Sequence, residues 1–443
     1  MKLIEALKNK RSLKWGVTAA IAVAIVFPLI QTNFFQNSFE LWFLTLIKNP
    51  LNFSLYVIFS LLFGSIVSLQ VYNLSKPKLD EKEDILERFK KSVPNQKVIK
   101  KSPLQFKKYS ENPIIYPNKR NSWESSQTFN PAAVLLNKKI HLLYRAIGQD
   151  GISRLGYANS KKGLKIDKRH PLPLYEHPFG QKSPMKFNFY SYSSGGSWGG
   201  CEDPRLINMR EDDRIYMTYT ACDNGLRVGL TSMNVRDFLK GKWKWEKPKL
   251  ISKLGEVHKN WVIFPEKIKG KYAILHSINP KISIAYRDSL DFKEGEYIES
   301  KYGGGKTKKG DWDNWIRGVG PPPLKTKEGW LVFYHAMDEN DPGKYKVGAL
   351  LLDLKNPEKI ICKAKKPILE PEEHYENIGF KSGVVYASGA IIKKGVLFIY
   401  YGGADSHVCV AYNDLQNFLY KLKKGVKPKL KKKILKRKEG KKK

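Results

Sequence analysis

The segment GGCEDPRLINM, Gly199–Met209, places two carboxylates, a proline and an arginine in a row after a loop rich in glycine and serine. Proline disfavours helical geometry for the residue before it, so Asp203 is expected in extended backbone. Residues i and i+2 of a strand share a face, which predicts that Asp203 and Arg205 point the same way and Glu202 the opposite way. A nearby guanidinium favours an ionised carboxylate, which suits sugar binding. The alternative is a surface turn closed by an Asp–Arg ion pair.

Similar polar residues interrupt apolar runs elsewhere in the chain. They are Arg145 in LLYRA, His276 in LHS, His335 in FYHA and Asp405 in GGAD. Taken singly, each is typical of a hydrogen-bonded residue at the end of a strand. Because they recur at comparable points of similar segments, we expect them to meet at one site.

Those segments follow a repeated pattern of an apolar run, a charged or glycine turn and a second apolar run, which is the signature of a β-hairpin. A third short strand is expected after each hairpin. Five copies in succession predict an all-β, five-bladed β-propeller over residues 105–420, with the site where the inner strands surround a central funnel. The five hairpins cover residues 132–146, 205–221, 263–277, 322–336 and 389–404.

The composition fits a folded, aromatic-rich protein, with 42% hydrophobic and 12% aromatic residues. Aromatic rings suit both β-structure and the binding of sugar rings. The four cysteines are far apart and form no CxxC pair. This spacing indicates neither a zinc site nor a disulfide framework, and it favours a reducing compartment.

Two uncharged apolar stretches near the N-terminus, residues 15–32 and 53–72, approach the length that a helix needs to cross a bilayer. They predict a transmembrane hairpin, residues 15–72, after a basic segment at 1–14. The alternative for the first stretch is a cleaved signal peptide. Basic residues flank both ends of the hairpin, so the propeller and both termini are predicted to be cytoplasmic. Residues 73–104 are expected to form a short charged helix and a linker.

The formal net charge of +37 is concentrated in part in the last segment, residues 421–443. A polybasic tail on a membrane protein is predicted to contact anionic lipids. Two alternatives are a tail that only aids solubility and a segment that binds nucleic acid. Nucleic-acid binding is the less favoured, because no zinc-finger, RNP or KH signature accompanies the charge.

Between about Asn112 and Asp414, the successive motifs resemble those of glycoside hydrolase family 130, the β-mannoside phosphorylases and related β-mannosidases. The motifs are FNPAAVLLNKKIHLLYRA, GCEDPR, HKNWVIFPEKIKGKYAILH, WDNWIRGVGPPPLKTKEGWLVFYHA, YKVGALLLDLKNPEKI and LFIYYGGADSHVCVA. The resemblance implies a five-bladed propeller that cleaves β-mannosides with inversion, or builds them in reverse from mannose 1-phosphate. The hairpin and the tail lie outside it.

The resemblance also implies roles for individual residues. Asp203 would be the proton donor, acting through a hydroxyl of the bound mannose. Inorganic phosphate would be a co-substrate, and no cofactor or metal is implied. The mannose pocket would contain Asn130, Arg145 and Asp405, with Arg205 beside Asp203; the phosphate site would contain Lys259, His335 and Tyr345.

Two positions depart from the family pattern. Ser277 stands where the phosphorylases carry an arginine, and Asn260 replaces the usual acidic residue after the lysine. A lost charge-assisted contact weakens phosphate binding by about 1.5–3 kcal/mol. A hydrolase instead needs a carboxylate to activate water, for which Glu266 and Asp313 are candidates.

Phosphorolysis is the predicted function, and hydrolysis of β-mannosides is the alternative. An inactive propeller that binds glycan is an alternative of another class. The expected partners are a β-mannoside oligosaccharide or glycolipid, and phosphate.

Overall fold

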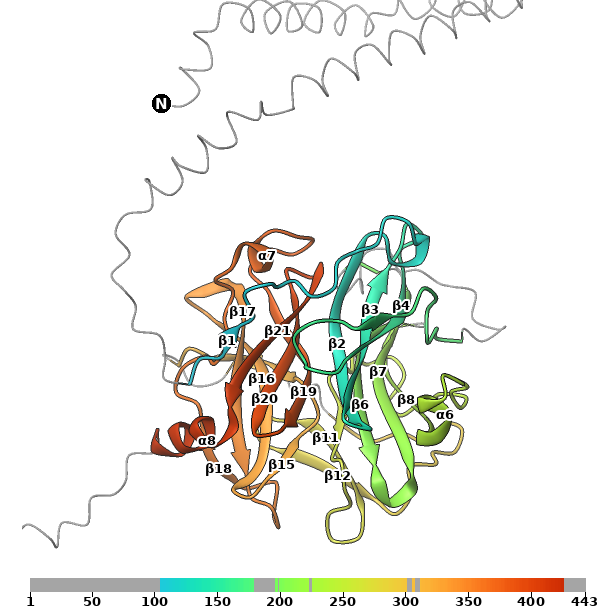
Figure 1. The fold of residues 1–443 in the computed structure, drawn as a ribbon. Helices are drawn as coiled ribbons and strands as arrows, with labels where there is room; N and C mark the ends of the chain where they lie inside the picture. Colours follow the sequence, from blue (N-terminus) through green and yellow to red (C-terminus); the bar gives the residue numbers. More distant parts are fainter. Residues whose placement is uncertain are drawn as a thin grey trace, which may run out of the picture. The chain divides into compact units, whose positions relative to one another are not determined.

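The computed structural model describes residues 104–178, 196–197, 199–222, 225–300, 305–306 and 311–425. These residues belong to one compact unit. The described chain is all-β with a few short helices, as the sequence predicted (Figure 1). The helices are α6 (Val235–Leu239), α7 (His374–Asn377) and α8 (Leu415–Lys424), with single 3-10 turns η1 (Ser122–Glu124) and η2 (Arg210–Asp212).

The described strands fall into five units in chain order, each antiparallel within itself, and a short parallel pairing between Ile152–Ser153 and Gly199–Gly200 joins the first two units into one sheet. Five such units are expected of a five-bladed propeller. The first comprises β2 (Gln127–Leu136), β3 (Lys139–Ile147), β4 (Ile152–Ser160) and β5 (Lys168–Arg169). The second comprises β6 (Gly199–Met209), β7 (Arg214–Cys222), β8 (Leu226–Asn234) and β9 (Lys249–Leu250). The third comprises β10 (Val262–Ile263), β11 (Tyr272–Ser277) and β12 (Ser283–Arg287).

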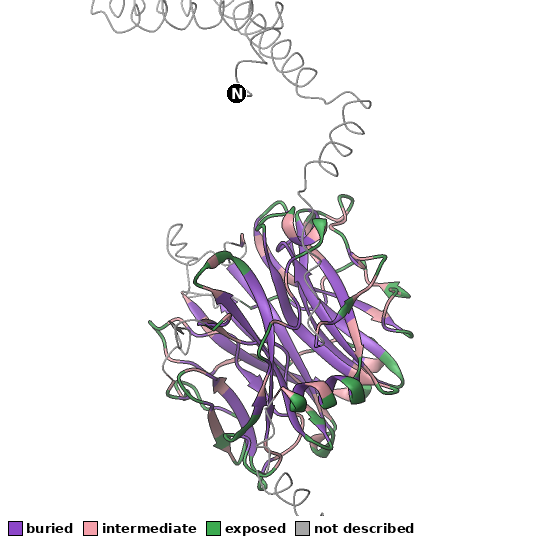
Figure 2. Cartoon of the chain, turned by 90° about the vertical axis from the view of Figure 1, so that its left-hand side faces the viewer, coloured by how far each residue is buried: buried purple, intermediate pink, exposed green. Residues whose placement is uncertain are grey.

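The fourth unit comprises β13 (Gly305–Lys306), β14 (Trp315–Val319), β15 (Leu324–Thr326), β16 (Gly329–Asp338), β17 (Asp341–Leu352) and β18 (Ile360–Lys363). The fifth comprises β19 (Val385–Lys393), β20 (Val396–Gly403) and β21 (His407–Asp414). The strand interiors are buried and most of the exposed residues lie in the connections (Figure 2). Each of the five predicted hairpins corresponds to a strand pair in one unit, which accounts for the repeat in the sequence.

The last unit is completed by the beginning of the described chain. Strand β1 (Lys107–Lys108) pairs antiparallel with β21. Helix α8 then packs the apolar side chains of Phe418 and Leu422 into a core shared with Phe106. Because α8 continues to Lys424, the folded part extends into the predicted tail, residues 421–443.

The first long strand of four units carries a β-bulge. In β2 the register shifts between Phe129 and Ala132, and in β6 it shifts between Glu202 and Arg205. Corresponding shifts interrupt β14 and β19. A bulge places an extra residue in one strand and redirects its side chain. Since β2 packs against both β6 and β19, these bulges bring polar residues from distant sequence positions toward one region.

The predicted membrane localisation, with the propeller and both termini in the cytoplasm, is wrong. Among the residues that the structure describes, no helix combines the length and apolar character needed to cross a bilayer. The predicted spans at 15–32 and 53–72, the segment at 1–14 and the linker at 73–103 lie outside the described residues. The same is true of most of the tail, residues 426–443, for which a lipid contact was predicted.

Candidate active site

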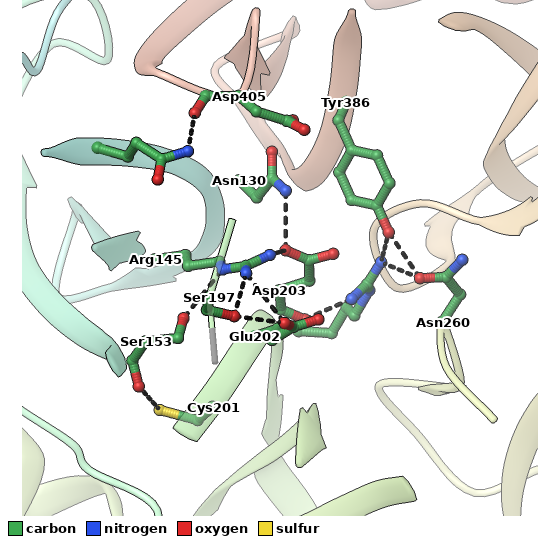
Figure 3. Close-up of polar contacts among 12 residues, drawn as sticks. Asn130, Arg145, Ser153, Ser197, Cys201, Glu202, Asp203, Asn260, Tyr386 and Asp405 are labelled. Carbon is green, nitrogen blue, oxygen red and sulfur yellow. Dashed lines mark hydrogen bonds and ion pairs between the residues drawn. The ribbon is translucent and has the colours of Figure 1, made fainter. Parts of the chain in front are cut away.

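Asp203 lies at the centre of a buried polar cluster (Figure 3). Its Oδ1 accepts a hydrogen bond of 2.7 Å from the Nδ2 of Asn130 and one of 3.2 Å from Nη1 of Arg145. These residues come from β6, β2 and β3, so the two neighbouring units build the cluster together. The structure therefore brings the predicted Asp203, Asn130 and Arg145 into direct contact.

The bulges explain how the short side chains of Asn130 and Asp203 reach each other. Both residues precede a proline, and both have left-handed backbone, with φ of 43° and 47°. Asparagine and aspartate tolerate this conformation better than most residues. The NP and DP pairs in FNPA and EDPR thus mark equivalent positions in the first two units.

The predicted alternation of side chains across Glu202, Asp203 and Arg205 is wrong. Glu202 does not point away from Asp203, because its Oε1 binds Nη2 of the same Arg145 at 3.0 Å. Arg205 does not pair with the Asp203 carboxylate; its Nη1 donates to the Asp203 backbone carbonyl. The period of two holds only for regular strands, and the bulge between Glu202 and Arg205 interrupts it.

Arg145 holds the acidic side of the cluster together. Besides both carboxylates, its guanidinium donates to Oγ of Ser153 at 2.9 Å and to Oγ of Ser197 at 2.8 Å. Its Cζ also lies 4.6 Å from the centre of the Phe129 ring. These contacts fix the planar guanidinium between the carboxylates and leave it 1% exposed.

The three carboxyl groups of the site differ in proton affinity. Burial disfavours the charge on Asp203, but the guanidinium groups of Arg145 and Arg205 outweigh burial and lower its pKa. Burial dominates at Glu202 and raises its pKa, although Arg145 opposes the effect. Burial also raises the pKa of Asp405 to about 6. The cluster thus holds one strongly ionised carboxylate beside two carboxyl groups that retain protons more readily.

Asp405 joins this cluster from the turn between β20 and β21. It is buried and has a φ of 48°. Its backbone carbonyl accepts a hydrogen bond of 2.8 Å from Nε2 of Gln127. Figure 3 shows it near Asn130, on the far side of Asp203 from Ser197. The structure thus places Asp405 beside Asn130, and its role in a mannose pocket with Asn130 and Arg145 stays a prediction.

Arg205 connects the Asp203 backbone to the other side of the site. Its Nη2 donates to Oδ1 of Asn260 and to the hydroxyl of Tyr386, both at 2.9 Å. The Tyr386 hydroxyl in turn donates to Oδ1 of Asn260 at 2.6 Å. Nε of Arg205 donates to the Gly320 carbonyl at 3.2 Å. All three side-chain nitrogens of Arg205 therefore donate hydrogen bonds to protein atoms. The contact predicted between Arg205 and the substrate stays a prediction.

His335 packs against the ring of Tyr386. The two rings stack with centroids 3.9 Å apart, and Nε2 of the histidine donates to the Ala387 carbonyl at 2.9 Å. His335 is fully buried, and burial lowers its pKa to about 3, so the ring is neutral near pH 7. With the proton on Nε2, the buried Nδ1 is an acceptor and cannot donate to a phosphate. The predicted phosphate contact of His335 therefore stays a prediction, and its observed contacts are with Tyr386 and Ala387.

Tyr345 lies among cationic groups. Its hydroxyl accepts a hydrogen bond of 2.7 Å from Nε of Arg317, and the Nζ of Lys381 lies 5.1 Å from the centre of its ring. Arg317 is the extra residue in the bulge of β14, which makes it the counterpart of Asp203 in the fourth unit. Lys381 is exposed and follows α7. Neither cation was predicted from the sequence.

The other predicted phosphate residues come from the third unit. Lys259 is half-buried, and its charge contributes, after burial and the two arginines, to the lowered pKa of Asp203. Ser277 is 9% exposed, and its hydroxyl donates to the Asn279 carbonyl at 2.9 Å. Asn260, which has a φ of 67°, is held by Arg205 and Tyr386 rather than being free for a ligand.

The two carboxylates considered as bases for hydrolysis bind other partners. Glu266 pairs with Lys325 on an exposed surface. Asp313 accepts a hydrogen bond of 2.6 Å from the Tyr334 hydroxyl and forms an ion pair with Lys363 at 2.6 Å. Neither has a described contact with the Asp203 cluster. In the described part of the chain, no group of three or more His, Cys, Asp or Glu residues could hold a metal ion.

Sequence reasoning missed Glu202, Arg317, Tyr386 and Ser388 as residues of this region. Ser388 is the extra residue in the bulge of β19, fully buried with an Oγ that has no hydrogen-bond partner among the described residues. One sequence signal was available. The extra residue is polar in all four bulged inner strands, and aligning those four repeats on Asn130 and Asp203 would have indicated Arg317 and Ser388.

Known proteins share this fold and these motifs over most of the chain. A family model for glycoside hydrolase family 130, described as beta-1,4-mannooligosaccharide phosphorylase, matches residues 76–424. A 1,2-beta-oligomannan phosphorylase from Thermoanaerobacter sp. (strain X514) is 35% identical over 72% of this chain and 100% of its own. A beta-1,2-mannobiose phosphorylase from the same organism is 33% identical over 68% of this chain and 95% of its own. The solved complex of the Listeria innocua beta-1,2-mannobiose phosphorylase with beta-1,2-mannobiose is 25% identical, with a TM-score of 0.55 over 72% of this chain and 99% of that one.

Proposed function

Because the chain belongs to glycoside hydrolase family 130, we propose that it cleaves β-mannosides by phosphorolysis with inversion and releases mannose 1-phosphate. Family membership makes it a glycosidase-type enzyme, so the inactive glycan-binding propeller is no longer needed as an explanation. Inorganic phosphate is the co-substrate. The reverse reaction would build β-mannosides from mannose 1-phosphate.

The observation that carries the proposal is the state of Asp203. Its Oδ1 is held by Asn130 and Arg145, whereas its Oδ2 receives no hydrogen bond from the described residues. Oδ2 is therefore free to bind a hydroxyl of the cleaved mannose. The side chain is fixed by the bulge and by two donors, so little ordering is required when the sugar binds.

The low pKa of Asp203 has to be reconciled with a role as proton donor. We assign the proton transfer to a relay, in which a mannose hydroxyl gives its proton to the leaving oxygen and is reprotonated by Asp203. A phosphate dianion bound nearby would raise the proton affinity of Asp203 by charge repulsion. Glu202 and Asp405, whose pKa values are raised, can hold protons in the same cluster.

The phosphate is assigned to the cationic side of the site. Lys259 approaches from the third unit, and Arg317 is bound to Tyr345 in the fourth. Arginine suits this task because its planar group donates two parallel hydrogen bonds to a phosphate. Arg317 could thereby compensate for the arginine that Ser277 replaces. His335 and Tyr386 then serve as the rigid support on which this side of the site rests.

We propose that the cleaved mannosidic linkage is β-1,2, and this linkage should be tested first. Three curated relatives above 30% identity are named for β-1,2-mannosides, whereas the family model is described for a β-1,4 substrate. Mannobiose of each linkage should be offered separately. We expect the β-1,2 compound to be the better substrate.

Hydrolysis is the second candidate function, and the serine at position 277 favours it because one phosphate contact is lost. The two reactions are separated by incubating the purified full-length chain with β-1,2-mannobiose, with and without inorganic phosphate. Phosphorus and proton NMR then measure mannose 1-phosphate and free mannose. Phosphorolysis requires phosphate and yields α-mannose 1-phosphate. Equally fast release of free mannose without phosphate would instead identify a hydrolase.

A further inference from the structure

An exposed aromatic residue lies at the edge of the site. Phe380 is 60% exposed and the nearby Ile378 is 59% exposed, on the loop between α7 and β19. We propose that Phe380, extended by Ile378, is a stacking platform for the departing sugar of the β-mannoside, on the acceptor side of the cleaved bond. This inference rests on the proposed function and names the part of the substrate that the loop recognises.

The loop is fixed to the turn that carries Asp405. The backbone N–H of Phe380 donates to Oγ of Ser406 at 2.7 Å, and the N–H of Lys381 donates to the Ala404 carbonyl at 3.0 Å. The two partners flank Asp405 in the sequence. The Phe380 backbone is thus attached directly beside a carboxyl group of the buried cluster.

The ring of Phe380 also meets the segment that supports Arg145. A Cβ placed on Gly196 would lie 2.7 Å from Cζ of Phe380, so the ring packs against the backbone of this glycine. The next residue, Ser197, donates to Glu202 at 2.7 Å and accepts from Arg145. Gly196 has a φ of +85°, where a side chain would be strained, so both space and backbone favour glycine. Phe380 therefore spans two segments that border the cluster.

Burial decides which sugar the ring can meet. The residues assigned to the cleaved mannose, Asn130, Arg145, Asp203 and Asp405, are each no more than 8% exposed. Phe380 is outside that buried set but next to it, so only a sugar beyond the cleaved bond can lie against its ring. Aromatic rings stack on the apolar C–H faces of pyranoses, and the exposed ring has no other described aromatic partner to cover it.

The test separates binding from turnover. In an Asp203→Asn background, titration calorimetry measures the affinity for β-1,2-mannotriose, and in the otherwise unaltered chain kinetics measure KM for mannobiose and for phosphate. Phe380→Ala should weaken mannotriose binding about 5- to 20-fold, the loss expected for one stacked ring. It should raise KM for mannobiose while leaving KM for phosphate within about twofold. Phe380→Trp should restore binding, and Ile378→Ala should have a smaller effect in the same direction.

Tyr420→Ala is the matched control, since Tyr420 is an aromatic residue of α8 with 57% exposure. It should change neither affinity nor KM. The platform is refuted if Phe380→Ala binds mannotriose as tightly as its parent, or if Tyr420→Ala weakens binding equally. If the unaltered chain cleaves mannobiose in either case, the proposed function stands and only the platform fails. If the chain neither binds nor cleaves any mannoside, both proposals fail.

Discussion

The amide of Asn130 donates to Oδ1 of Asp203 at 2.7 Å, and the two residues occupy equivalent bulges in β2 and β6. An amide donor at this point stabilises a carboxylate without adding charge. Asn130→Asp is nearly isosteric and tolerates the positive φ, but it brings two carboxylates within hydrogen-bond distance, so they must share a proton. The second carboxylate raises the pKa of the shared proton, so we expect the pH–rate profile for mannoside cleavage to move to higher pH and the maximal rate to fall. An unchanged profile would mean that the contact does not tune Asp203.

Asp203→Asn should abolish most of the turnover. The amide cannot pass a proton to the mannose hydroxyl, and general acid catalysis is typically worth about 10²- to 10⁴-fold. Release of mannose 1-phosphate measures the rate, and circular dichroism checks the fold. Asp288→Asn, which alters a carboxylate with an 85% exposed side chain, is the control and should remain fully active. Near-native activity of Asp203→Asn would reduce this carboxylate to a structural role.

Asp405→Asn should stabilise the fold above pH 6 while impairing cleavage. Burial raises the pKa of Asp405 to about 6, so the folded state binds its proton more tightly than the unfolded state does. Stability from this group is full at low pH and is lost as the pH rises from about 4 to 6. Removing the charge should therefore raise the free energy of unfolding at pH 7.5 by about 1–3 kcal/mol, with little gain at pH 4. Denaturant unfolding at both pH values measures this, and equal effects would contradict the assignment.

Arg317→Met should weaken phosphate binding. Loss of a charge-assisted contact costs about 1.5–3 kcal/mol, so KM for phosphate should rise about 10- to 100-fold. KM for mannobiose should change little, because the side chain of Arg317 binds Tyr345, and its backbone carbonyl keeps the hydrogen bond from Asn260 in the variant. Arg236→Met, on the exposed surface of α6, is the control. An equal rise in both KM values would point to a general disturbance of the site.

His335→Phe tests whether this residue binds phosphate or supports Tyr386. Phenylalanine preserves the stacked ring but loses the hydrogen bond to the Ala387 carbonyl. We expect KM for phosphate to stay within about threefold and the free energy of unfolding at pH 7 to fall by about 1–2 kcal/mol. A tenfold or larger rise in KM for phosphate, without loss of stability, would favour the direct contact predicted from the sequence.

Much of the fold could be predicted, because hairpin and blade repeats are local patterns. The apolar run, turn and apolar run recur five times, and each corresponds to a strand pair in one unit. The motifs also identified the family and led to Asp203, Arg145 and Asp405. The localisation could not be predicted in this way, because a hydropathy window describes the chain segment and not the structure to which it belongs.

Local sequence patterns show which residue types stand at the ends of the inner strands and how often the unit repeats. Which of these residues meet depends on how the units pack together. The orientation of Glu202 depends on a bulge whose existence is set by pairing with β7, so strand periodicity alone gave the wrong face. The convergence of Arg205 with Asn260 and Tyr386 joins three units across long sequence separations. Proton affinities depended on the folded chain for the same reason: Asp203 and Asp405 are identical in covalent structure, but burial and the two neighbouring arginines shift their pKa values in opposite directions.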